Sequence, residues 1–173
     1  MPPPTMDVLY QRGVFIMYRF QEENRFPYRK SPRLKSYDYS KKNFYFITIC
    51  THQKKCIFGS PTQINILGKL AENALLNIQK HFSDIRVDKY AIMPNHVHII
   101  FEAVKDGTDL TNVIGSFKSA VTKEIHKILP DLVVWKRSFY DHIIRNQKSY
   151  EEIWVYIDGN PLKWAEDCFY IEE

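Results

Sequence analysis

The sequence has 173 residues, 45% of them hydrophobic and 25% charged, and its formal net charge is +4. This length suits one globular domain of about 100–200 residues, and the mild positive charge permits a polyanionic partner without requiring one. No apolar run approaches the ~20 residues of a membrane-spanning helix, and the first four residues lack the charged region of a signal peptide. The cysteines form no CxxC pair, which favours free thiols in a reducing cytoplasm over a disulfide framework or a zinc cluster: Cys50, Cys56 and Cys168.

Residues 1–28 are predicted to be an N-terminal extension, and one domain is expected over residues 29–173. The extension begins with prolines and shows no clear period, which leaves disorder and a docked strand at residues 14–17 both open. A basic stretch interleaved with tyrosines follows, a composition suited to phosphate contacts and base stacking. Composition alone favours a solvated loop over a DNA contact for its cationic residues: Arg29, Lys30, Arg33, Lys35, Lys41 and Lys42.

The rest of the chain alternates between strand and helix patterns. Segments rich in aromatic and β-branched residues predict strands at residues 43–51, 85–92, 97–101 and 133–135. Apolar residues at helical spacing predict helices at residues 65–81, 110–129 and 147–157. This order is the plan of an α+β, ferredoxin-like antiparallel sheet with helices packed on one face. The last helix, which bears a tyrosine, lies outside that plan.

The Pro-Asn-His-Val-His segment carries the first candidate site. His96 and His98 are two residues apart on a predicted strand, so alternation places both imidazoles on the same face. Two nitrogens side by side on a rigid strand can hold two positions of a divalent cation. The alternative is a polar sheet face that carries two histidines by chance.

The last predicted helix carries the second candidate pair. Tyr156 and Asn160 are four residues apart and share a helix face if the helix persists to its last turn. Gly159 and Pro161 place Asn160 at the frayed end of that helix. A core tyrosine and a C-terminal capping residue are the structural alternatives.

A His-hydrophobic-His pair followed by Tyr-Ile-x-x-Asn-Pro resembles the single-tyrosine HUH transposases of bacteria, in particular the REP-associated tyrosine transposases. Further similar segments occur in the same order, at residues 33–39, 46–51, 90–98 and 138–146. The resemblance spans roughly residues 29–167 and identifies residues 29–173 as an HUH transposase domain.

The resemblance implies that His96, His98 and Asn160 hold one divalent ion, Mg²⁺ or Mn²⁺, which neutralises charge on the scissile phosphate. It assigns Tyr156 as the nucleophile, whose attack leaves a 5′-phosphotyrosine link and a free 3′-hydroxyl. The covalent link conserves the bond energy, so resealing requires no ATP. The weaker candidates for phosphate or base contacts are His142 and Arg145, for which structural hydrogen bonding is an equal alternative.

The implied enzyme is a metal-dependent transposase that cleaves and rejoins single-stranded or hairpin DNA. We expect it in the bacterial cytoplasm, associated with the nucleoid when bound to DNA and without a membrane partner. Both a homodimer and a monomer stay open. The main alternative is a domesticated, non-cleaving sequence-specific DNA-binding protein, and a second is a metal-dependent hydrolase in which Tyr156 is structural.

Overall fold

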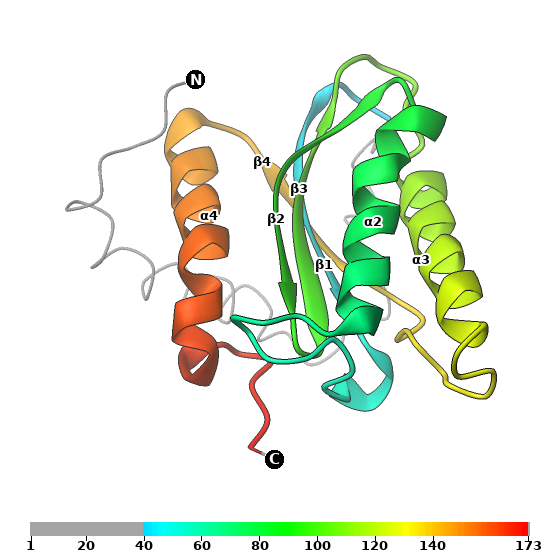
Figure 1. Cartoon of the computed structure of the whole chain (residues 1–173). Helices are drawn as coiled ribbons and strands as arrows, with labels where there is room; N and C mark the ends of the chain where they lie inside the picture. Colours follow the sequence, from blue (N-terminus) through cyan, green and yellow to red (C-terminus); the bar gives the residue numbers. More distant parts are fainter. Residues whose placement is uncertain (1–39, 173) are drawn as a thin grey trace.

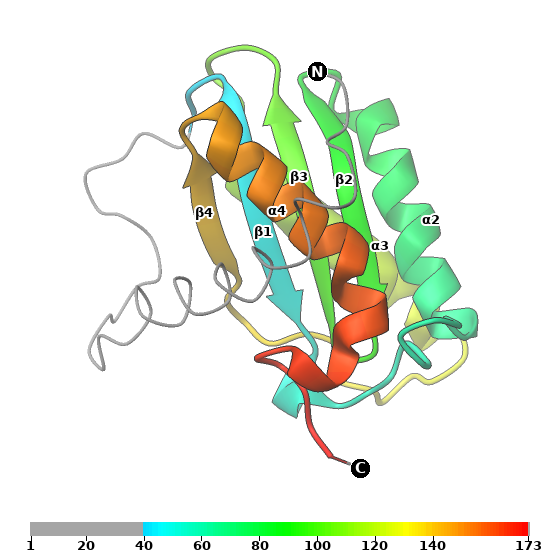
Figure 2. The ribbon, with the colours of Figure 1, turned by 90° about the vertical axis from the view of Figure 1, so that its left-hand side faces the viewer.

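The computed structural model describes residues 40–172 and contains one four-stranded antiparallel sheet within them. The strand order is β2-β3-β1-β4, with bounds β1 Asn43–Cys50, β2 Ile85–Met93, β3 His96–Ala103 and β4 Tyr140–Ile144. Two helices, α2 (Ile66–His81) and α3 (Leu110–His126), cover one face, and α4 (Gln147–Gly159) crosses the other (Figures 1 and 2). The predicted α+β fold is therefore confirmed.

Side-chain caps explain where the helices begin. The carboxamide of Asn65 accepts hydrogen bonds from the backbone N–H groups of Leu67 and Gly68 at the start of α2. Asp109 caps α3 in the same way, and the Asn146 side chain accepts from the Ser149 N–H at the start of α4. Such caps satisfy backbone donors that have no partner inside the helix.

Alternation along the strands builds two different layers. The core between the sheet and α2 and α3 contains Tyr45, Ile47 and Ile49 from β1. The intervening residue Phe46 instead packs with Ile153 and Ile157 of α4 in a smaller apolar cluster on the opposite face. Each strand therefore supplies both layers, because successive side chains point to opposite faces.

The fourth strand lies later in the chain than the sequence predicted. Residues 133–135 contribute only an isolated bridge between Thr51 and Trp135, and Val133 is 58% exposed. Strand β4 pairs with β1 instead, and its Ile143 and Ile144 are buried on opposite faces of the sheet.

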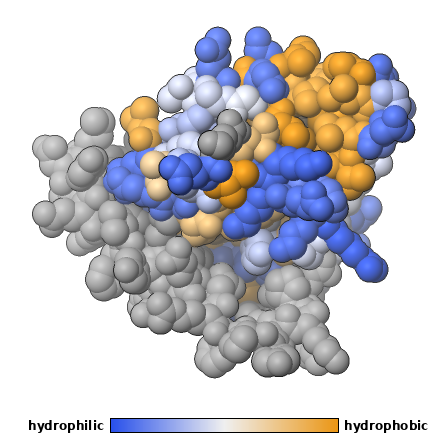
Figure 3. Space-filling model, turned by 90° about the horizontal axis from the view of Figure 1, so that it is seen from below, coloured by the Kyte–Doolittle hydropathy of each residue, from blue (hydrophilic) through white to orange (hydrophobic). Residues whose placement is uncertain are grey.

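Seen from below, apolar side chains gather on the side of α2 and α3, while polar ones cross the middle (Figure 3).

Two helix ends also differ from the prediction. Helix α3 ends at His126 rather than at residue 129. Helix α4 runs to Gly159 and continues directly into a 3₁₀ helix, η3 (Asn160–Glu166), with Pro161 in its first turn. Asn160 is therefore held in helical geometry, with φ of −59° and ψ of −42°, and is not frayed.

The predicted extension at residues 1–28 lies outside the described residues, as do Arg29, Lys30, Arg33 and Lys35. All three cysteines are free thiols. None of the helices within residues 40–172 has the length and apolar character needed to cross a membrane.

Candidate active site

The histidine pair lies at the start of β3, which is one of the two inner strands of the sheet. His96 and His98 are 0% and 1% exposed, and both side chains lie on the α4 face. Their Nε2 atoms are 2.9 Å apart. The predicted placement of both rings on one face is confirmed, and Val97 between them belongs to the opposite core.

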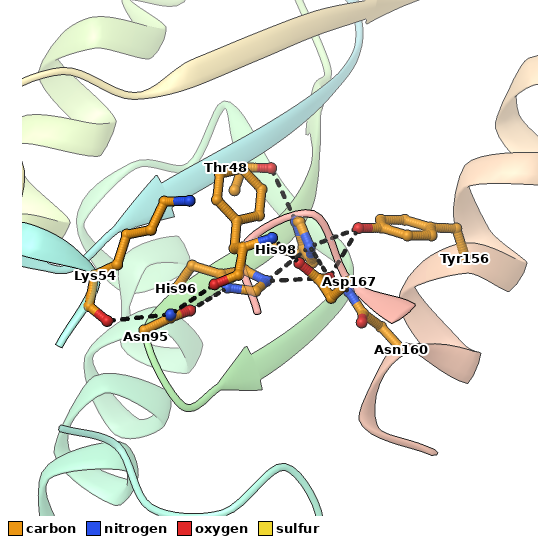
Figure 4. A network of polar contacts seen from close by, with 9 residues as sticks. Thr48, Lys54, Asn95, His96, His98, Tyr156, Asn160 and Asp167 are labelled. Atoms are coloured by element: carbon orange, nitrogen blue, oxygen red, sulfur yellow. Dashed lines mark hydrogen bonds and ion pairs between the residues drawn. The ribbon is translucent and has the colours of Figure 1, made fainter. Parts of the chain in front are cut away.

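Two buried polar residues orient these rings through their Nδ1 atoms. His96 Nδ1 lies 2.8 Å from the Asn95 side-chain oxygen, and His98 Nδ1 lies 2.8 Å from Thr48 Oγ1. The Asn95 amide nitrogen donates to the carbonyls of Lys54 and Phe169, so its oxygen accepts a hydrogen bond from the N–H at His96 Nδ1. The Nε2 lone pair of His96 therefore faces the centre of the site (Figure 4).

A carboxylate that the sequence did not predict completes this cluster. Asp167 follows η3 and is 5% exposed. Its Oδ2 atom lies 3.7 Å from His96 Nε2 and 3.8 Å from His98 Nε2. The ligand atoms of these three residues lie within 4.8 Å of one another, which is close enough to hold one metal ion.

Tyr156, on α4, joins the same cluster from the other side (Figure 4). Its hydroxyl donates to Asp167 Oδ2 at 3.1 Å and lies 3.2 Å from His98 Nε2. The ring packs edge-on against Phe46. The sequence placed the tyrosine and the histidines on separate elements, and the structure brings them within hydrogen-bond distance.

Asn160 lies one helical turn beyond Tyr156 and is 3% exposed. Its amide nitrogen donates to Asp167 Oδ2 at 2.7 Å. Its side-chain oxygen is buried and has no hydrogen-bond partner within residues 40–172. A buried carbonyl oxygen without a donor is costly, so this atom is available to a cation.

Burial sets the protonation of the site. It lowers the pKa of His96 well below the usual value, with the neighbouring His98 adding to the effect, so His96 is neutral. Burial raises the pKa of Tyr156 well above 10, and Asp167 raises it further. Burial opposes the charge on Asp167, but its hydrogen bond to His98 and the nearby imidazoles hold its pKa below the usual value.

Two of the three cysteines, Cys50 and Cys168, are weak nucleophiles. Burial raises the pKa of Cys50 to about 11 and that of Cys168 to about 12. Thiolates, not thiols, attack electrophiles, and both groups are therefore protonated at neutral pH.

The donor set fits a divalent cation. The ligand atoms of His96, His98 and Asp167 all lie within 4.8 Å of one another. Asn160, which bonds to that carboxylate, adds a buried oxygen that has no partner within residues 40–172. Oxygen donors suit Mg²⁺ and Mn²⁺. The hydrogen bonds from Nδ1 to Asn95 and Thr48 are those expected of metal-binding histidines, whose second nitrogen is normally held by a neighbour.

The predicted DNA contacts are spread over the sheet. Lys41 and Lys42 precede β1 and lie at the opposite end of that strand from Cys50, which pairs with His96. Lys41 forms an exposed ion pair with Asp106. His142 lies in β4, where it pairs with Phe46 of β1, and the exposed Arg145 follows β4.

Sequence reasoning missed Asp167, Asn95 and Thr48. Asp167 lies eleven residues after Tyr156, beyond a kink at Lys163 within η3. Asn95 directly precedes the histidine motif, and this adjacency is the signal that could have indicated a role for its side chain at the site. Thr48 lies opposite His98 in the β1–β3 register, which pattern reasoning does not supply.

Comparisons with known proteins show the family and the fold. A family model described as IS200-like transposase matches residues 39–160. An uncharacterized protein of Haemophilus influenzae strain Rd is 36% identical over 170 residues, which covers 84% of this chain and 94% of that protein. The structure of a REP-associated tyrosine transposase bound to a REP hairpin covers 78% of this chain and 76% of its own, with a TM-score of 0.60 and 18% identity. A candidate transposase from Deinococcus radiodurans R1 covers 73% of this chain and 95% of its own, with a TM-score of 0.50 and 15% identity.

Proposed function

The chain belongs to the IS200-like transposase family, and we propose that it cleaves and rejoins single-stranded or hairpin DNA through a covalent link to Tyr156. The family makes it a transposase, an enzyme of DNA cleavage and strand transfer. The observation that carries the finer proposal is one buried cluster in which the Tyr156 hydroxyl lies within 3.2 Å of both His98 Nε2 and Asp167 Oδ2.

The chain's own residues account for nucleophilic attack. Asp167 accepts the hydrogen bond of the Tyr156 hydroxyl and orients its oxygen for attack. The low pKa of Asp167 makes this carboxylate a poor base for a phenol, so the proton of the hydroxyl is released to solvent during the attack. The phenol oxygen then bonds to phosphorus, and the bond from phosphorus to the 3′ oxygen breaks. The products are a 5′-phosphotyrosine and a 3′-hydroxyl, and the reverse attack reseals the strand.

His96, His98, Asp167 and Asn160 are the residues that would hold a divalent cation. When bound, Mg²⁺ or Mn²⁺ would neutralise charge on the phosphate. The sequence-based ligand set contained Asn160 but not Asp167. We include both because the Asp167 carboxylate adjoins the two histidines and the buried amide of Asn160 bonds to that carboxylate. Thr48 and Asn95 hold the two rings in position.

Hairpin DNA is the proposed substrate, and the REP hairpin in the related structure supports this class of partner. The shared fold, with a TM-score of 0.60, is a further support for a DNA partner.

A denaturing gel tests the proposal. The protein is incubated with Mn²⁺ or Mg²⁺ and labelled single-stranded hairpin DNA from the flanks of its own gene. We expect a covalent protein–DNA band that is absent in Tyr156→Phe and absent when EDTA is present from the start of the reaction. Tyr150→Phe is the matched control, because this second tyrosine of α4 bonds to Asp88 and lies outside the cluster.

Two outcomes would contradict the proposal and identify its replacement. Cleaved DNA without a covalent band would indicate a metal-dependent hydrolase in which Tyr156 is structural. Binding without cleavage, with several flanking sequences and both metals, would indicate a domesticated DNA-binding protein.

A further inference from the structure

Two half-buried aromatic rings lie beside the histidine pair and belong to neither apolar cluster. The Phe169 ring lies 4.8 Å from the His96 ring, centroid to centroid. Tyr140, at the start of the edge strand β4, lies 5.8 Å from Phe169. Core packing therefore does not explain why two aromatic side chains, from separate segments of the chain, meet at this place.

A lysine ammonium group lies near each of the two rings. Lys54 Nζ lies 5.3 Å from the centroid of Phe169. Lys136 Nζ lies 5.1 Å from the centroid of Tyr140 and donates to its hydroxyl at 3.1 Å. Both lysines are exposed, and neither forms an ion pair with a carboxylate of residues 40–172. Their charges are therefore free to meet an anion.

The backbone fixes these groups relative to the site. Gln53 and Lys54 adopt left-handed conformations, with φ of 55° and 56°, which residues other than glycine rarely adopt. The buried amide of Asn95 binds the carbonyls of both Lys54 and Phe169 while its oxygen holds His96. One side chain thus ties the lysine, the aromatic ring and the histidine together. Strained backbone retained in this way is typical of functional sites.

We infer that Phe169 and Tyr140, with Lys54 and Lys136, form a platform that binds an unpaired nucleotide next to the scissile phosphate. Aromatic rings flanked by cations are the arrangement with which proteins hold single strands, since rings stack on bases and lysines contact phosphates. Only an unpaired base exposes the face that such stacking requires. This inference rests on the proposed function, because the platform adjoins the cluster assigned to cleavage. It assigns Phe169 and Tyr140 to substrate positioning.

A binding cycle tests the platform without requiring cleavage. Fluorescence anisotropy measures the affinity of the Tyr156→Phe protein for a single-stranded hairpin oligonucleotide and for versions with one abasic position each. Phe169→Ala should weaken binding by about 10- to 100-fold, and Phe169→Leu by a similar factor, whereas Phe169→Trp should bind normally. One abasic position should weaken binding to the parent protein but have little further effect on Phe169→Ala.

The lysines have a separate readout. Lys54→Ala and Lys136→Ala should each reduce the slope of log affinity against log salt by about 0.7. Lys127→Ala is the matched control, because this exposed lysine pairs with Glu124 at the end of α3 and should leave the slope unchanged. Mn²⁺ binding and the melting temperature of each variant show whether the cluster and the fold persist.

The results separate this inference from the proposed function. A covalent adduct with wild-type protein, together with normal binding by Phe169→Leu or additive abasic effects at every position, would overturn the platform alone. Coupling between Phe169 and one base, without any adduct, would support the platform and overturn the cleavage mechanism. Equal affinity for single-stranded and fully paired DNA would also overturn the platform.

Discussion

The two faces of the central strand β3 perform different tasks. Val97, Ile99 and Phe101 point into the apolar core under α2 and α3, whereas His96 and His98 point toward α4 and Tyr156. Neighbouring residues of one strand thus serve stability and chemistry separately, because alternation directs them to opposite faces. The site is rigid because the strand that carries its histidines is anchored by the core behind it.

The largest expected difference between the faces is in stability. Ile99→Ala should lower the free energy of unfolding by about 2–5 kcal/mol, because Ile99 is fully buried in the apolar core. His98→Ala, on the other face of the same strand, should cost less than half as much while abolishing adduct formation. Urea denaturation followed by circular dichroism measures both. Equal losses of stability would show that the two faces are not separable.

Metal binding should stabilise the protein through the α4 face alone. Mn²⁺ at 100 times its dissociation constant should add about 2.7 kcal/mol to the free energy of unfolding, because it binds only the folded site. The gain should vanish in His96→Ala and decrease in both Asn160→Ala and Asp167→Asn. Thermal unfolding with and without Mn²⁺ measures it. An undiminished gain in Asp167→Asn would remove that carboxylate from the ligand set.

A smaller effect should come from Thr48, which touches the site only through His98. Thr48→Val keeps the side-chain shape but removes the oxygen that holds Nδ1, so Mn²⁺ affinity should fall by about 10- to 100-fold. Isothermal titration calorimetry measures the change. Thr122→Val on α3 is the control, since its hydroxyl bonds to the carbonyl of Lys118 away from the site. Unaltered Mn²⁺ affinity in Thr48→Val would argue against ring positioning by Thr48.

The smallest effect is expected at the far end of β1. Lys41→Ala removes an exposed ion pair with Asp106, and such pairs contribute about 0–1 kcal/mol. Its effect on hairpin affinity should be smaller than that of Lys136→Ala, because Lys41 lies at the opposite end of the strand from the site. Anisotropy titrations compare the two. A larger loss in Lys41→Ala would show that DNA crosses the whole sheet and would support the sequence-based assignment.

Local patterns were enough to predict the parts of the molecule that repeat regularly. Richness in aromatic and β-branched residues located β1, β2 and β3, and apolar residues at helical spacing located α2. Alternation along a strand predicted that His96 and His98 share a face. The spacing of four residues correctly placed Asn160 beside Tyr156. The helical path continues from α4 into η3 at Asn160, so this residue does not lie at a frayed helix end.

Tertiary contacts determine the features that the sequence did not reveal. The fourth strand was placed at residues 133–135, where three apolar residues occur, but pairing with β1 selects Tyr140–Ile144. Asp167 reaches the histidines from a segment without a recognisable motif, beyond the kink at Lys163. No pattern along the chain indicates that Asn95 connects Lys54, Phe169 and His96, since all three contacts depend on the folded chain.

Mass-spectrometric mapping of the protein–DNA adduct tests the central claim most directly. The adduct formed with Mn²⁺ and hairpin DNA is digested with nuclease and protease, and the modified peptide is sequenced. The chain contains 11 tyrosines, so the position of the modification is informative. A nucleotide linked through its 5′-phosphate to Tyr156 is the predicted result. Modification of a different residue would contradict the assignment of the α4 face as the catalytic one.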